Sequence, residues 1–166
     1  MSKIRENLED LTSRILINND MYNIPVDPIK IAKTYDIEVY QGELDNKIAG
    51  AIRYYKENNK FKILVNKKDS MVKKRFTIAE ELGYYILYEE KLKKEEIHVN
   101  LIDKIINKEE KEVEYFAGAL LVNKTLLENV YNSNSTILEL AQLFKVSISS
   151  MTLRLNILGL LYWNKK

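Results

Sequence analysis

Apolar residues recur with helical spacing at the start of the chain. Within residues 3–18, Ile4, Leu8, Leu11 and Ile15 lie three or four positions apart. Because this spacing places side chains on one face of a helix, the segment is predicted to form an amphipathic helix. Charged residues fill many of the other positions, so the apolar face is expected to pack against the rest of the protein.

A second helix is predicted to begin at the prolines. Both prolines of the chain fall here, as Pro25 and Pro28. Asp27 is well placed to cap a helix that has Pro28 in its first turn and runs to Tyr35.

The spacing then changes to that of strands and back to that of a helix. Runs rich in β-branched and aromatic residues follow one another, and the polar segment 56–60 is suited to a hairpin turn between two of them. The predicted elements are strands at 37–40, 48–55, 61–65 and 97–101, and a helix over 76–88.

The C-terminal segment has the spacing of a helix-turn-helix. Residues 136–144 and 148–158 are predicted helices, with Val146 in the turn and Ser147 as N-cap of the second. As a DNA-reading element, the second helix would present Ser149, Ser150, Thr152, Arg154 and Asn156. As a packing module, the pair would bury Leu140, Leu143, Phe144, Met151, Leu155 and Leu158. The DNA-reading set holds a single cation, and both interpretations stay open at this point.

Composition and charge narrow the function classes. The chain has 166 residues, with 26 Lys and Arg against 24 Asp and Glu, so its net charge of +2 gives no general electrostatic case for nucleic acid. Without cysteine, neither a disulfide framework nor a thiolate metal site can form. The N-terminus is charged throughout, and no apolar run approaches the ~18 residues of a membrane span. We therefore expect a cytoplasmic protein with no membrane partner.

The most informative motif lies in the predicted helix over 76–88. A zinc-peptidase helix carries His-Glu-x-x-His, in which two imidazoles on one helix face bind zinc and the Glu serves as general base. The corresponding residues here are Glu80-Glu81-Leu82-Gly83-Tyr84. The position of the general base is kept, whereas both histidine positions are replaced.

Five blocks, in order along the chain, resemble the ImmA/IrrE family of metallopeptidases. They are Ile24–Ala32, Ile63–Asn66, the helix that begins Arg75-Phe-Thr-Ile-Ala, Glu112–Leu121 and Leu140–Gly159. The resemblance implies an α+β, zincin-like minimal metallopeptidase fold, in which a small antiparallel or mixed sheet packs on helices. It also implies a metallopeptidase-like domain at 1–131 and a helical segment at 132–166 packed on it.

Carried over by position, the family's zinc ligands fall on Glu80, Tyr84 and Glu112, and its general base falls on Glu81. A phenol such as that of Tyr84 has a pKa of about 10 and must lose its proton to bind zinc well. We therefore expect no bound cofactor, although active relatives use zinc. An oxygen-only site of Glu80, Glu81 and Glu112 for Mg, Mn or Ca is a weaker alternative.

Carboxylates around an empty site repel one another, so a hydrogen-bonding or cationic group is expected to enter the gap. The Tyr84 hydroxyl is predicted to donate to Glu80 or Glu112, and a lysine from a neighbouring segment is a further candidate. His98 is the only histidine. It is predicted to be an ordinary strand or loop residue, because one imidazole cannot rebuild a two-histidine site.

The resemblance implies a regulatory role, since members are encoded by mobile elements and prophages and inactivate helix-turn-helix repressors. We expect a non-catalytic pseudo-peptidase that binds a partner protein, such as a repressor, through the former substrate groove. Strands 48–55 and 61–65 are expected to supply the edge of that groove. One alternative is an active metallopeptidase with unusual ligands that cleaves a repressor. The other is a DNA-binding regulator that acts through its C-terminal helices.

Overall fold

A computed structural model of the chain describes residues 3–103, 106–132 and 134–161. The helices are α1 (Lys3–Asn18), α2 (Pro28–Thr34), α3 (Met71–Glu95), α4 (Lys108–Leu121), α5 (Lys124–Val130), α6 (Ile137–Phe144) and α7 (Ile148–Ile157). The strands are β1 (Glu38–Gly42), β2 (Ile48–Tyr55), β3 (Lys60–Asn66) and β4 (Ile97–Leu101). The predicted α+β class and small mixed sheet are confirmed.

The four strands form one sheet in the order β1-β3-β2-β4. β1 lies parallel to β3, whereas β2 pairs antiparallel with both β3 and β4. The expectation that β2 and β3 supply a free edge is wrong, because each of them has a strand on both sides. The edges of the sheet are β1 and β4, and β4 is the edge that runs beside the middle of α3.

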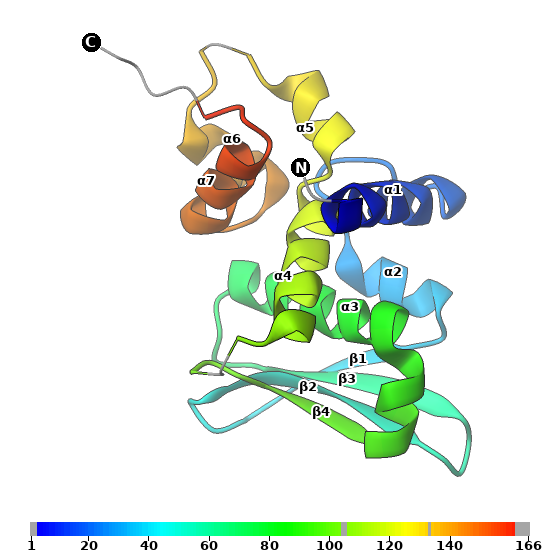
Figure 1. Ribbon diagram of the computed structural model, residues 1–166. Coiled ribbons are helices and arrows are strands. Elements are labelled where there is room, and N and C mark those ends of the chain that lie inside the picture. The colour runs from blue at the N-terminus through cyan, green and yellow to red at the C-terminus, as the bar shows by residue number, and fades with distance from the viewer. Residues whose placement is uncertain (1–2, 104–105, 133, 162–166) are drawn as a thin grey trace.

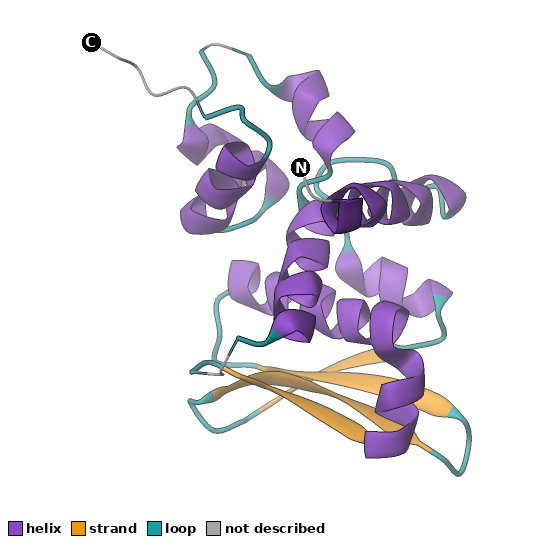
Figure 2. Ribbon diagram, in the orientation of Figure 1, coloured by secondary structure: helices purple, strands orange, loops and turns teal. Residues whose placement is uncertain are grey.

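Helices cover one face of the sheet, as Figures 1 and 2 show. α3 lies along the sheet, α4 packs on α3, and α1 packs on α4. Ile52, Ile63 and Val65 face these helices and are at most 1% exposed. Tyr40 and Val99 point to the uncovered face and are exposed, as the alternation of side chains along a strand requires.

The helix caps follow the sequence closely. The Asp27 side chain accepts hydrogen bonds from the backbone N–H groups of Ile29 and Lys30, and α2 begins at Pro28 as predicted. α3 begins earlier than predicted, because Ser70 caps it by accepting from Lys73 N–H. It also continues to Glu95, past a kink at Tyr88, where the backbone is not helical.

The C-terminal helices join the common hydrophobic core. Ser147 caps α7 as predicted, and Val146 and Phe144 are buried. Leu143, expected in the buried face, is instead 46% exposed. It lies on the side of α6 that faces away from α7 and the rest of the core. The predicted division of the chain at residues 131 and 132 stays a prediction.

A buried ion pair fastens α7 to α1. The Arg154 guanidinium donates to both carboxylate oxygens of Glu9, at 2.6 and 2.7 Å, and its Nε donates to the Val122 carbonyl. The Tyr115 hydroxyl also donates to Glu9, at 2.7 Å. Burial and this hydrogen bond raise the pKa of Tyr115 to about 12. Arg154 is therefore a structural residue, so its placement among exposed DNA-reading side chains is wrong.

Across the residues described, no helix is both long and apolar enough to cross a membrane.

Candidate functional site

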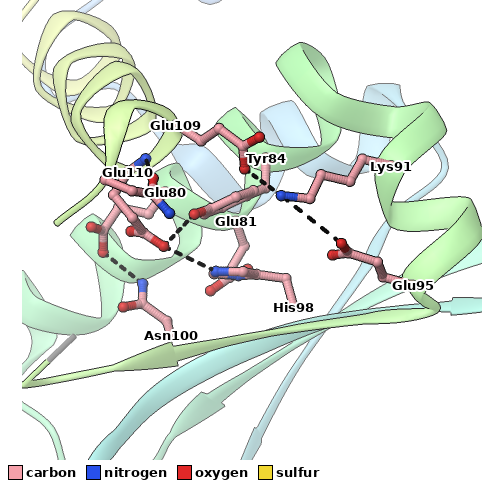
Figure 3. Close-up of polar contacts among 10 residues, drawn as sticks. Glu80, Glu81, Tyr84, Lys91, Glu95, His98, Asn100, Glu109 and Glu110 are labelled. Atoms are coloured by element: carbon pink, nitrogen blue, oxygen red, sulfur yellow. Dashed lines mark hydrogen bonds and ion pairs between the residues drawn. The ribbon is translucent and has the colours of Figure 1, made fainter. Parts of the chain in front are cut away.

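Polar side chains from three elements meet beneath the middle of α3 (Figure 3). They are Glu80, Glu81 and Tyr84 from α3, His98 and Asn100 from β4, and Glu110 from α4. All are buried except His98, whose side chain is 15% exposed. Buried polar groups must find partners, so their mutual contacts define what the site can do.

Local rules explain why these side chains converge. Positions 80, 81 and 84 lie within about one turn of α3, and alternation along β4 turns His98 and Asn100 toward that helix. Asn107 caps α4 by accepting from Glu110 N–H at 2.9 Å. This places the Glu110 carboxylate at the positive end of the helix dipole, where an anion is favoured.

Gly83 lets α4 approach α3 closely enough to deliver Glu110. A Cβ atom at this position would lie 3.0 Å from Cδ1 of Phe116 and 3.3 Å from Cγ1 of Val113, both on α4. A side chain at this position would therefore require Phe116 and Val113 to shift.

Tyr84 donates its hydroxyl proton to Glu110. Burial, together with this hydrogen bond, raises the pKa of Tyr84 far above its ordinary range, so the phenol stays protonated. The predicted acceptor was Glu80 or Glu112. Glu112 lies about half a turn further along α4 and accepts instead from the Tyr88 hydroxyl, at 2.7 Å. The acidic residue of α4 that reaches Tyr84 is thus Glu110.

His98 enters the gap between the carboxylates. Its Nδ1 lies 3.1 Å from Glu81 Oε2 and its Nε2 lies 3.4 Å from Glu110 Oε1. The ring stacks on Tyr84 with centroids 3.6 Å apart. Burial lowers the pKa of His98, but the hydrogen bond and charge of Glu81, joined by those of Glu110, outweigh it and the net shift is upward. His98 lies in a strand, as predicted, but its contacts with two carboxylates and its stacking on Tyr84 make it part of this cluster.

The outer part of the cluster is also paired. Asn100 donates its side-chain N–H to Glu80 at 2.9 Å. Lys91, which belongs to a segment considered as a source of the gap-filling cation, instead pairs with Glu109 and Glu95. Figure 3 shows this lysine outside the cluster.

One signal in the sequence points to residues that position reasoning missed. In β4, polar His98 and Asn100 alternate with apolar residues, which marks one face of the strand as polar. In α4, both Glu110 and Glu112 share a helical phase with buried apolar residues, so spacing does not choose between them.

The comparisons with known proteins decide the family. A profile of the IrrE N-terminal-like domain, a peptidase family, matches residues 32–156. The chain belongs to this family. No curated protein sequence matches it. The structure of a Mycobacterium tuberculosis transcriptional regulator is similar, with a TM-score of 0.60 and 17% identity. The match covers 91% of this chain and 46% of that one, so the chain spans about half the regulator's length.

The IrrE-like family implies zinc, and the donors of this site do not fit it. A zinc peptidase needs two neutral imidazoles and a carboxylate around an open position. Here the Tyr84 hydroxyl donates to a carboxylate, and both nitrogens of His98 lie against carboxylates. Within the described ranges, no three His, Cys, Asp or Glu side chains are grouped so that they could hold a metal ion.

The predicted DNA-reading residues of α7 do not form one surface in this IrrE-like chain. Ser149 and Asn156 are exposed, whereas Ser150 lies 2.8 Å from the Ser147 hydroxyl and Thr152 donates to the backbone of its own helix. Arg154, the cation of the set, is 3% exposed and paired with Glu9.

Proposed function

We propose that this chain is a non-catalytic member of the IrrE-like family that regulates by binding a partner protein, such as a repressor. The observation that carries the proposal is the His98 ring, which lies between Glu81 and Glu110 and stacks on Tyr84. An imidazole from β4 thus occupies the space beneath the helix where active relatives hold their metal. The general-base position, Glu81, faces this ring, with its Oε2 3.1 Å from His98 Nδ1.

The edge strand β4 supports a binding role beside the filled site. Ile97, Val99 and Leu101 alternate along its outer face and are 37–45% exposed. An edge strand presents unpaired backbone groups, and a partner's extended segment can pair with them. The fold shared with a transcriptional regulator agrees with this role, although a fold alone does not fix a function.

Metal content tests the loss of catalysis. The purified chain, incubated with zinc and desalted, is expected to retain far less than one zinc per chain. The double variant Glu80→His/Tyr84→His restores two imidazoles at helical spacing and is expected to retain about one. Zinc near one equivalent in the unaltered chain, together with peptide hydrolysis, would instead establish an active peptidase with unusual ligands.

Partner binding is tested along β4 with a control on the opposite edge. Val99→Lys places a charge on the exposed face of β4, and Tyr40→Lys does the same on β1. With the helix-turn-helix repressor encoded nearest the gene as the probe, Val99→Lys is expected to weaken binding at least tenfold, whereas Tyr40→Lys leaves it unchanged. Equal binding by both variants would remove β4 as the docking edge.

A further inference from the structure

A cavity of about 440 Å³ lies between α4 and α7. Lys111, Tyr115 and Gly118 follow one another at helical spacing along its α4 wall, and Leu153 and Ile157 line it from α7. Neither Glu110 nor any other residue of the candidate site lines this cavity, so the two are separate. Its volume falls within the range of about 300–1,000 Å³ that is usual for small-molecule sites.

The floor of the cavity is apolar and is not closed by side-chain packing. Phe76, Leu121 and Val146 contribute to it, and Leu153 on the α7 wall is 50% exposed. A Cβ atom built on Gly118 would meet no other atom within 4 Å. Residues in a well-packed helix interface leave no such gap, so the space at Gly118 is free for an apolar group from outside the chain.

The rim of the cavity carries two cations and one carboxylate, so its net charge is positive. Arg5 and Lys111 line it together with Glu114, and within the described part of the chain neither cation forms an ion pair. The Arg5 guanidinium lies over the Tyr115 ring, 5.5 Å from its centroid. Ser149 and Ser150 add the first turn of α7, whose dipole also favours an anion. The wall residue Arg154 is neutralised by Glu9 and adds no net charge.

We propose that this cavity binds a small carboxylate with an apolar chain. The chain would lie between α4 and α7 over Gly118, and the carboxylate would face Arg5 and Lys111. A ligand seated there touches both helices and so couples the position of the C-terminal helices to the body of the protein. Such a site is independent of whether the former metal position is catalytic.

Octanoate, below its micelle-forming concentration, is the probe, with isothermal titration calorimetry and the melting temperature of the full chain as readouts. We expect saturable binding and a raised melting temperature. Octylamine reverses the charge and octanol removes it, so both are expected to bind at least tenfold more weakly than octanoate. Octylamine binding as tightly as octanoate would overturn the assignment of a carboxylate, and no saturable binding of octanoate would overturn the site.

Variants of the two walls locate the site. Gly118→Leu fills the cavity and is expected to abolish binding, whereas the matched Gly118→Ala keeps affinity within about threefold. Lys111→Gln is expected to weaken binding about tenfold, as for the loss of a hydrogen bond to a charged group. If Gly118→Leu lowers the melting temperature of the free protein, octanoate binding is measured instead with Leu153→Trp. This substitution fills the cavity from the α7 wall and is likewise expected to abolish binding. Undiminished octanoate binding in a folded, cavity-filled variant would place the ligand elsewhere.

Discussion

The imidazole of His98 combines burial with two acidic neighbours. A buried cation is costly unless it is paired, and here Glu81 and Glu110 lie on opposite ring nitrogens. Tyr84 contributes in another way, because its protonated hydroxyl satisfies Glu110 while its ring covers the imidazole. The raised pKa of His98 favours a positive charge between these two carboxylates.

This arrangement predicts a pH dependence of stability. The pKa of His98 is raised above its unfolded value of about 6.5. Its contribution to the free energy of unfolding is therefore complete below about pH 6.5 and is lost as the pH rises through the folded-state pKa. The melting temperature of the unaltered chain is expected to exceed that of His98→Gln most at low pH, and the difference is expected to shrink as the pH rises.

The chain offers a clean measurement of this effect, because His98 is its only histidine and no other imidazole titrates in the same range. Melting curves of the two proteins at matched ionic strength report the difference. A gap that stays constant, or widens with pH, would contradict a protonated ring between the carboxylates.

A second prediction concerns which acidic residue of α4, Glu110 or Glu112, would complete a restored zinc site. In the Glu80→His/Tyr84→His background, zinc is expected to be lost on adding Glu110→Gln and kept on adding Glu112→Gln. The reason is that Glu110 reaches position 84, whereas Glu112 is turned toward Tyr88. Metal analysis of the two triple variants decides between them, and the reverse order would restore Glu112 as the ligand position.

Matching the family's motif to the sequence identified the residues of the candidate site that lie on α3. It missed those on β4 and α4, and the reason is physical. Glu80, Glu81 and Tyr84 are fixed relative to one another by helix geometry, which is local. His98 comes from a strand whose place depends on pairing with β2, and the choice between Glu110 and Glu112 depends on the rotation of α4 about its axis. Both are set by tertiary packing, which spacing along the chain does not express.

At the scale of elements, the buried contact between α1 and α7 fastens the C-terminal helices to the body. Glu9 and Arg154 are 145 residues apart in sequence and are both buried. A buried ion pair contributes little more to the free energy of unfolding than well-packed apolar residues in its place would. Removing one partner is nevertheless costly, because it leaves the other charge buried without a counter-charge.

Arg154→Met is therefore expected to lower the free energy of unfolding by about 3–5 kcal/mol. The double variant Glu9→Met/Arg154→Met is expected to be more stable than this single variant, because it leaves no stranded charge. Urea denaturation measures both. Asn156→Met, exposed on the same helix, serves as the control and should change stability by no more than about 0.5 kcal/mol. A double variant less stable than Arg154→Met would show that Glu9 stabilises the protein even without Arg154, through contacts such as the hydrogen bond from Tyr115.

The elements themselves were largely readable from the sequence, whereas their order in the sheet was not. Caps at Asp27 and Ser147 and the β-branched and aromatic runs of β2 and β3 are local signals, and they predicted these elements correctly. The predicted helix over 76–88 was shorter than α3, because the charged residues of its last turns lack an apolar pattern. In the structure, ion pairs one turn apart, such as Glu89–Lys93, support the helix there. The interior place of β2 and β3 follows from long-range pairing with β1 and β4.

At the scale of the whole molecule, charge and burial argue together against sequence-specific DNA binding. The net charge is +2, and the cation expected to read bases is buried against α1. With fluorescence anisotropy at physiological salt, an operator fragment and a scrambled fragment are expected to bind equally weakly. Binding that prefers the operator by a factor of about 1,000 or more, the lower end for specific recognition, would instead support a DNA-reading role for α7.

The hydrogen bond from Asn100 to Glu80 and the stacking of Tyr84 on His98 also bear on how this site could gain a metal. A histidine at position 80 alone removes the carboxylate that accepts from Asn100, and a histidine at 84 alone removes the ring stacked on His98. Either single substitution loses existing contacts while it supplies only one of two helical imidazoles. Each alone is therefore expected to lower stability, and a zinc site of this kind is expected to need both substitutions together.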